Sequence, residues 1–91
     1  MEIRLIGNRH DVIGFGLAGL DGVECRTRPE LVAALDAAER DPSVALVIVS
    51  PRAAALGTDI IARLRESVRL PIVVVLPDPL ADTRSERPHA A

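Results

Sequence analysis

A glycine-rich segment from Gly14 to Gly19 (GFGLAG) matches the G-x-G-x-x-G fingerprint of dinucleotide-binding enzymes letter for letter. In that fingerprint the first glycine directly follows a strand, and the last glycine lies in a helix whose N-terminus holds the pyrophosphate. Here the strand predicted upstream ends at Ile6, and the residues after Gly19 predict a turn and a new strand. We therefore interpret the glycines as the end of a helix and place a dinucleotide-dependent enzyme third among the functional hypotheses.

Four polar residues are predicted where a doubly wound sheet reverses its winding, which is where such sheets bind ligands. Asn8 and Arg9 follow the first predicted strand, and Ser50 and Arg52 follow the third. The two arginines suggest an anion, so the second hypothesis is a regulatory domain that binds a small ligand or an anion. Ser50 has no histidine near it in the predicted fold, and we interpret it as a polar residue leaving a strand.

Other chemistry is not indicated by the residues. A phosphate-accepting receiver domain needs acidic residues after the first strand, an aspartate after the third and a lysine, whereas this chain has Asn8, Arg9 and Ser50 there and no lysine. The single cysteine, Cys25, allows no internal disulfide and lacks partners for a metal site. The sequence thus predicts a protein that is not an enzyme and holds no metal or cofactor.

Composition narrows the class of protein further. The chain of 91 residues predicts one domain, with 11 arginines, a net charge of −2 and one aromatic residue, Phe15. A nucleic-acid surface normally has a basic excess and aromatic stacking platforms, so this composition argues against nucleic-acid binding. No apolar run approaches the ~18 residues of a membrane span and no signal-peptide pattern opens the chain, so we expect a cytoplasmic protein without direct membrane insertion.

Strands and helices are predicted to alternate along the chain. The expected strands are Glu2 to Ile6, Val23 to Arg26, Val44 to Val49 and Leu70 to Leu76. The first helix is expected to start within Asn8 to Asp11 and to stop at Gly19, with a buried side made of Val12, Ile13, Phe15, Leu17 and Ala18. Gly14 and Gly16 weaken that helix but are expected to let it approach the sheet closely.

The later helices carry clearer end signals. Thr27 and Glu30 form a capping box ahead of four apolar residues at helical spacing, Leu31, Val32, Leu35 and Ala38, and Asp41-Pro42 ends that helix. A helical turn over Ala53 to Leu56 is expected to break at Gly57. The last helix restarts at Thr58 and Asp59, with an Asp59–Arg63 pair and one apolar side formed by Ile60, Ile61, Leu64 and Val68.

The fold class follows from two unbroken apolar strands, VALVIV and LPIVVVL, which are typical of burial on both faces. Such strands with helices between them predict a parallel sheet covered on each side. Right-handed crossovers favour the strand order 2-1-3-4, so we predict a small, doubly wound, flavodoxin/receiver-like α/β domain over residues 1–77. Residues 78–91 are predicted to be an irregular, proline-containing tail, and we expect a chain cut after Asp78 to keep its fold.

The first helix also resembles a known family. A short strand, a glycine, charged residues with an aspartate and a helix closing in G-F-x-L-A-G resemble the F subunit of V-type (archaeal and vacuolar) ATP synthases. The residues that carry the resemblance are Met1, Ile3, Ile6, Gly7, Asp11, Gly14, Phe15, Leu17, Ala18 and Gly19. It continues through Pro29-Glu30, the strand Ala45 to Val49, and Leu70 to Val73 with Pro77.

The resemblance implies a non-catalytic subunit of the rotary central stalk, which is our leading hypothesis. In that family this subunit binds the coiled-coil shaft subunit alongside the other subunits of the V/A-type ATPase, peripheral to the membrane, and helps couple ATP turnover to rotation. Family members usually carry a further C-terminal helix. Pro77 to Ala91 contains three prolines and few apolar residues, so we expect this chain to lack that helix.

Overall fold

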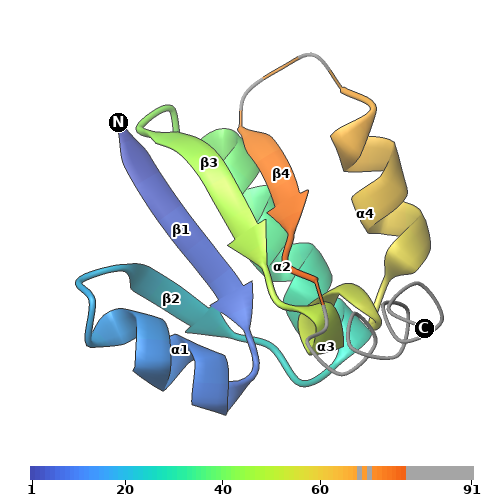
Figure 1. Cartoon of the computed structure of the whole chain (residues 1–91). Helices are drawn as coiled ribbons and strands as arrows, with labels where there is room; N and C mark the ends of the chain where they lie inside the picture. The colour runs from blue at the N-terminus through green and yellow to red at the C-terminus, as the bar shows by residue number, and fades with distance from the viewer. Residues whose placement is uncertain (68, 70, 78–91) are drawn as a thin grey trace, which may run out of the picture.

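The computed structural model describes residues 1–67, 69 and 71–77 (Figure 1). The strands are β1 (Glu2–Gly7), β2 (Asp21–Glu24), β3 (Val44–Val49) and β4 (Ile72–Val75). The helices are α1 (Arg9–Gly16), α2 (Arg28–Arg40), α3 (Pro51–Ala54) and α4 (Thr58–Arg65). Expectations for Val68, Leu70 and the tail from Asp78 onward lie outside the described residues.

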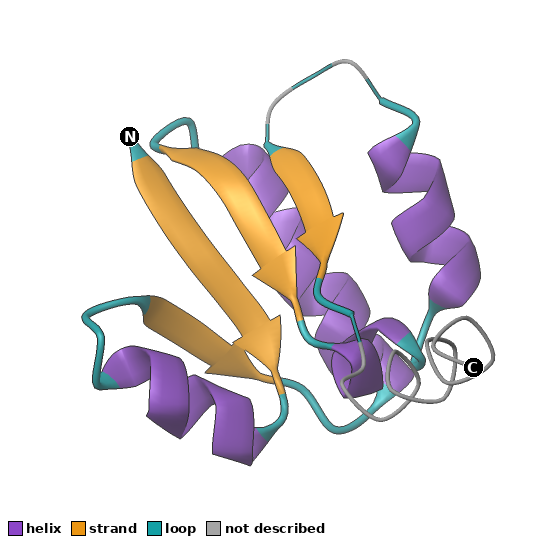
Figure 2. Ribbon diagram, viewed as in Figure 1, coloured by secondary structure: helices purple, strands orange, loops and turns teal. Residues whose placement is uncertain are grey.

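The four strands form one parallel sheet in the order β2-β1-β3-β4, as predicted. Figure 2 shows α2 behind the sheet, on the opposite side from α1. The predicted α/β fold with helices flanking the sheet is therefore confirmed. In the strand register Ile3, Leu46 and Ile72 form one cross-strand row.

One sheet face is closed by α2 and α4, and we call it the closed face. Its core consists of Ile6, Val47, Val49 and Val73 from the strands, Leu31, Ala34, Leu35 and Ala38 from α2, and Ile61 from α4. Every one of these side chains is at most 7% exposed. Val32, which the sequence placed in this core, is instead 42% exposed, because Ala34 takes the position that faces the sheet.

The other face, which we call the α1 face, is covered by α1 over β1 and β2. Gly22 of β2 lies so close to α1 that a Cβ there would be 3.0 Å from Val12 Cγ1. The prediction that α1 buries an apolar side was wrong: no residue of α1 is fully buried, Val12 and Phe15 are half-buried, and Ile13 is exposed. Leu17 and Ala18, in the turn after α1, are also exposed.

The glycines of α1 do not have the predicted packing role. A Cβ added at Gly14 or Gly16 would meet nothing within 4 Å, so neither glycine brings the helix closer to the sheet. The glycine that permits close approach is Gly22, on the strand side of the contact. Gly19 adopts φ +90°, a left-handed conformation that favours glycine, in the turn that leads from α1 into β2.

Two strands differ from the predicted ones. β2 begins at Asp21, two residues earlier than expected, because its register is set by pairing with β1 and not by its own weak β-propensity. β4 is not buried on both faces: Ile72 is 57% exposed and Val74 is 41% exposed. The apolar run predicted burial on both faces, but in the described chain no helix covers this part of the α1 face.

The predicted helix ends are partly confirmed. The Thr27–Glu30 capping box is present, and α2 ends at Arg40 with Asp41 as its C-cap. The short helix α3 starts at Pro51, earlier than expected, with Ser50 as its N-cap. Asp59 does not pair with Arg63; it makes two 2.9 Å bonds with the guanidinium of Arg28 at the start of α2.

Candidate functional site

Asn8 and Ser50 lie at the carboxyl ends of β1 and β3, and both are occupied in capping helices. Asn8 Oδ1 accepts a 3.1 Å hydrogen bond from the Asp11 amide at the start of α1. Ser50 Oγ accepts a 3.2 Å hydrogen bond from the Ala53 amide in α3. Ser50 is fully buried, so its hydroxyl does not face solvent. Asn8 thus lies at the helix start that the sequence predicted within Asn8 to Asp11, whereas Ser50 has a capping role that the sequence interpretation did not assign.

Gly7, at the end of β1, allows Ser50 and Asp11 to pack closely around the carboxyl edge of the sheet. A Cβ at Gly7 would lie 3.2 Å from Ser50 Oγ and 3.4 Å from the Asp11 Cβ. The end of β1 is thus packed against both α1 and the β3–α3 turn. Of the family-motif residues, Gly7 and Asp11 belong to this packed junction.

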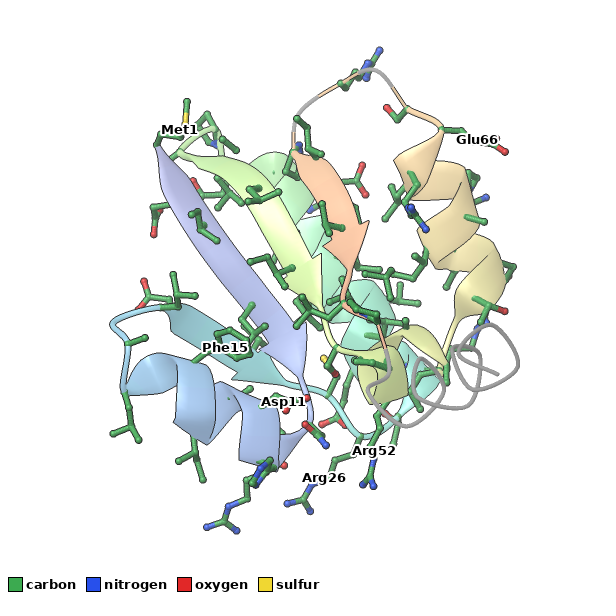
Figure 3. All side chains as sticks on the ribbon, in the orientation of Figure 1. Met1, Asp11, Phe15, Arg26, Arg52 and Glu66 are labelled. Carbon is green, nitrogen blue, oxygen red and sulfur yellow. The ribbon has the colours of Figure 1, made fainter. Side chains whose placement is uncertain are left out.

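Arg9 and Arg52, the proposed anion ligands, are both exposed, and neither forms a salt bridge with another described residue. Figure 3 shows Arg26 and Arg52 at the carboxyl edge of the sheet, both pointing away from the molecule. The sequence prediction placed Arg26 inside a strand and did not include it in the site. The sequence could have indicated its place, because a residue that directly follows a strand of a parallel sheet lies at this edge. Arg26 Nε is bonded to Glu24 Oε2 at 2.6 Å.

Two groups beside this edge have shifted pKa values. The Arg26 backbone amide donates to Glu30 Oε1, and this hydrogen bond lowers the pKa of the Glu30 carboxyl, with Thr27 adding to the effect. Burial raises the pKa of the Cys25 thiol, and the neighbouring carboxylates of Glu30 and Glu24 raise it further. A buried thiol held in its neutral form is a poor nucleophile. Cys25 therefore packs as a small apolar side chain.

None of the predicted anion ligands lines the cavity on the closed face. A cavity of about 100 Å³ lies between α2, α4 and the sheet, and none of its lining residues is Asn8, Arg9, Ser50 or Arg52. Among the described residues no group of three His, Cys, Asp or Glu side chains could hold a metal ion. The anion-binding hypothesis stays a prediction.

The family motif lines a shallow groove on α1. The groove, of about 300 Å³, is bordered by His10, Asp11, Gly14, Phe15 and Ala18. Phe15 lies between α1 and the sheet in Figure 3. Since Val12 points to β2 and Asp11 points to the end of β1, this flank of α1 is the one that faces away from β2.

Beyond that flank the sheet presents apolar side chains that the described helices do not cover. We call the two cross-strand rows Ile3–Leu46–Ile72 and Leu5–Ile48–Val74 the open rows. Leu5 pairs with Gly22, which touches Val12, so the open rows belong to the α1 face. Leu46 and Ile48 are half-buried, and Ile3, Ile72 and Val74 are exposed, whereas Leu5 at the β1 end of its row is fully buried.

No helix of the described residues has the length and apolar character needed to cross a lipid bilayer. No curated protein matches the chain. The sequence does match the family described as ATP synthase (F/14-kDa) subunit, over residues 3–89, which includes the open rows, the α1 motif and most of the tail. The resemblance found in the first helix is confirmed, and the chain belongs to the ATP synthase F-subunit family.

Proposed function

We propose that this protein is a non-catalytic subunit of the central stalk of a V/A-type ATP synthase or ATPase, where it binds the coiled-coil shaft subunit. The observation that carries the proposal is the family match, which spans residues 3–89 of a chain of 91. The match covers the sheet and its helices together, which supports a subunit role for this domain as a whole. The protein then acts in the cytoplasm, peripheral to the membrane.

The chemistry of the described residues supports a binding role. Ser50 is buried and caps α3, Asn8 caps α1, and Cys25 is buried with a raised pKa. These three side chains are thus committed to the fold, while Arg9 and Arg52 remain exposed at the same edge. A subunit of this kind would contribute a surface, while ATP turnover takes place on other subunits.

Co-purification tests the proposal. The full chain is co-expressed with the shaft subunit encoded in the same genome, and the pair is analysed by size-exclusion chromatography with mass measurement. We expect a stable complex that contains one copy of each chain. As a control, an unrelated antiparallel coiled coil of similar length should not bind. If the two chains elute separately at micromolar concentrations, the central-stalk assignment is wrong.

A further inference from the structure

The α1 face is unequally covered. Parallel sheets occur almost only with helices on both faces, because their strands carry apolar side chains on each side. Here α1 covers β1 and β2, while Ile72 and Val74 on β4 are 57% and 41% exposed and Ile3 on β1 is 40% exposed. Figure 1 shows β3 and β4 with α2 behind them and no described helix in front.

Residues 78–91 do not offer a suitable cover for the open rows. The described part ends at Pro77, just after β4, and 14 residues follow. Among residues 78–91 the only large apolar side chain is Leu80. A helix that packs on the open rows needs apolar residues at positions i, i+3, i+4 and i+7. Residues 78–91, with a single such residue, cannot supply this stripe.

From this we infer that the open rows are a docking surface for an amphipathic α-helix of a second protein, lying along β3 and β4 beside α1. All six members of the rows are aliphatic and none is charged. The helix that fits them therefore presents an aliphatic, uncharged stripe. The inference rests on the proposed function for the identity of the partner: the helix belongs to the coiled-coil shaft.

In this proposal the groove on α1 forms the boundary of the docking surface. Gly14 lines the groove and has open space where a side chain would be, so a helix seated on the open rows can pass close to the α1 backbone there. Gly16 has equally open surroundings but does not line the groove. The two glycines therefore form a matched pair for an experiment.

The test measures the affinity of the full chain for the shaft subunit by titration calorimetry. Ile72→Glu places a charge in the open rows, and Leu17→Glu places the same charge at a site that is 88% exposed and outside them. We expect Ile72→Glu to weaken binding at least tenfold and Leu17→Glu to change it less than twofold. Gly14→Leu should weaken binding at least fivefold more than Gly16→Leu. Circular dichroism confirms that each variant is folded.

Crosslinking provides a second readout. It uses no charged substitution, so it does not depend on whether Ile72→Glu folds. Ile72→Cys or Leu17→Cys is labelled with a maleimide benzophenone, which leaves the buried native Cys25 unmodified. Illumination should crosslink the Ile72→Cys protein, and not the Leu17→Cys protein, to a shaft helix. If the wild type binds the shaft but the Ile72 and Leu17 variants have equal affinities and equal crosslinking yields, the open rows are not the docking surface, and the proposed function still stands. No binding by the wild type would overturn both.

The other possible occupants give different outcomes. If the open rows join two copies of this chain, sedimentation shows a dimer that Ile72→Glu dissociates, and the inference is wrong. If the tail covers them in the full chain, the benzophenone on Ile72→Cys crosslinks to the tail and not to the shaft, and the inference is wrong as well. We expect a monomer, and a crosslink from Ile72→Cys to the shaft.

Discussion

The two faces of this sheet differ in how far they bury the apolar side chains of the same strands. On the closed face Val47, Val49 and Val73 meet α2 and α4 and are at most 7% exposed. On the α1 face the alternate residues of the same strands, such as Ile72 and Val74, remain accessible. An apolar strand in this chain therefore does not by itself mean a finished core. The closed face buries its apolar side chains, whereas the α1 face leaves several accessible, and it is there that we propose a partner docks.

The largest expected difference concerns stability. Leu31→Ala removes a fully buried side chain of the closed face, and such truncations cost about 2–5 kcal/mol because they leave a cavity. Ile72→Ala on the α1 face should cost less than about 1 kcal/mol, since most of that side chain is already in water. Urea denaturation of both variants checks this. Equal losses would mean that the two faces contribute alike to folding.

Ser50 directly follows β3 and caps α3, and we expect the loss of its hydroxyl to have an intermediate effect on the free energy of unfolding. Ser50→Ala deletes the hydroxyl that accepts from the Ala53 amide at the start of α3, and loss of such a cap costs about 0.5–2 kcal/mol. Arg52→Ala in the same turn is the control, because Arg52 is exposed and should matter little. A neutral Ser50→Ala variant would show that the cap does not hold this junction.

Gly22 tests how tightly α1 is held against its half of the sheet. A Cβ at this position would lie 3.0 Å and 3.3 Å from the two Val12 methyl carbons, so no rotamer of Val12 moves both away. We expect Gly22→Ala to lower the unfolding free energy by about 1 kcal/mol. The same change in a Val12→Ala background should cost clearly less. A double-mutant cycle by thermal denaturation measures the coupling, and additivity would contradict the contact.

Substitution of Gly14 by alanine is predicted to raise the unfolding free energy, in contrast to the substitution at Gly22. Gly14 lies inside α1 with nothing near its missing Cβ, so Gly14→Ala should stabilise the isolated chain by about 0.5–1 kcal/mol through helix propensity alone. Thermal denaturation with Gly16→Ala as the comparison checks the value. A loss of stability would show that Gly14 is packed in the free protein, and its place at the edge of the docking surface would need another explanation.

The smallest expected effect is the pH dependence of the Arg28–Asp59 pair on the closed face. Hydrogen bonding to Arg28 lowers the pKa of the Asp59 carboxyl from 3.8 to about 2. The folded state is thus favoured above the unfolded-state value, and this contribution disappears as the pH falls from about 4 to about 2. Both side chains are largely exposed, so the pair contributes little to stability. At pH 7 Asp59→Asn should lower the midpoint temperature of thermal unfolding by at most a few degrees, and near pH 2 it should leave that temperature unchanged. Melting curves across this range decide it.

Much of the scaffold could be predicted because its signals are local. The capping box of Thr27 and Glu30 fixes the start of α2 within four residues of sequence, and the VALVIV run identifies β3. The strand order followed from general rules of handedness and burial. The family was also visible in one short segment, since G-F-x-L-A-G follows the right strand at the right distance.

The errors came from long-range packing that the sequence pattern does not record. Asp59 looks paired with Arg63 at helical spacing, yet it bonds to Arg28, which is 31 residues away. Ile13 and Leu17 have the spacing of a buried helix side, but α1 touches the sheet through Val12 and Phe15 only partly. The open rows were missed for the same reason: an apolar run indicates what a strand can bury and not whether a helix is there to bury it.

The strand order also determines when each part of the sheet is completed during synthesis. The segment from β1 to β2 spans residues 2–24 and can pair as soon as it is made. The strand β3 can then join β1, but its other neighbour, β4, begins only at Ile72. While α3 and α4 are being translated, β3 is an edge strand with apolar side chains on both faces, which is a state prone to aggregation. We therefore expect the nascent chain to depend most on chaperones in that interval.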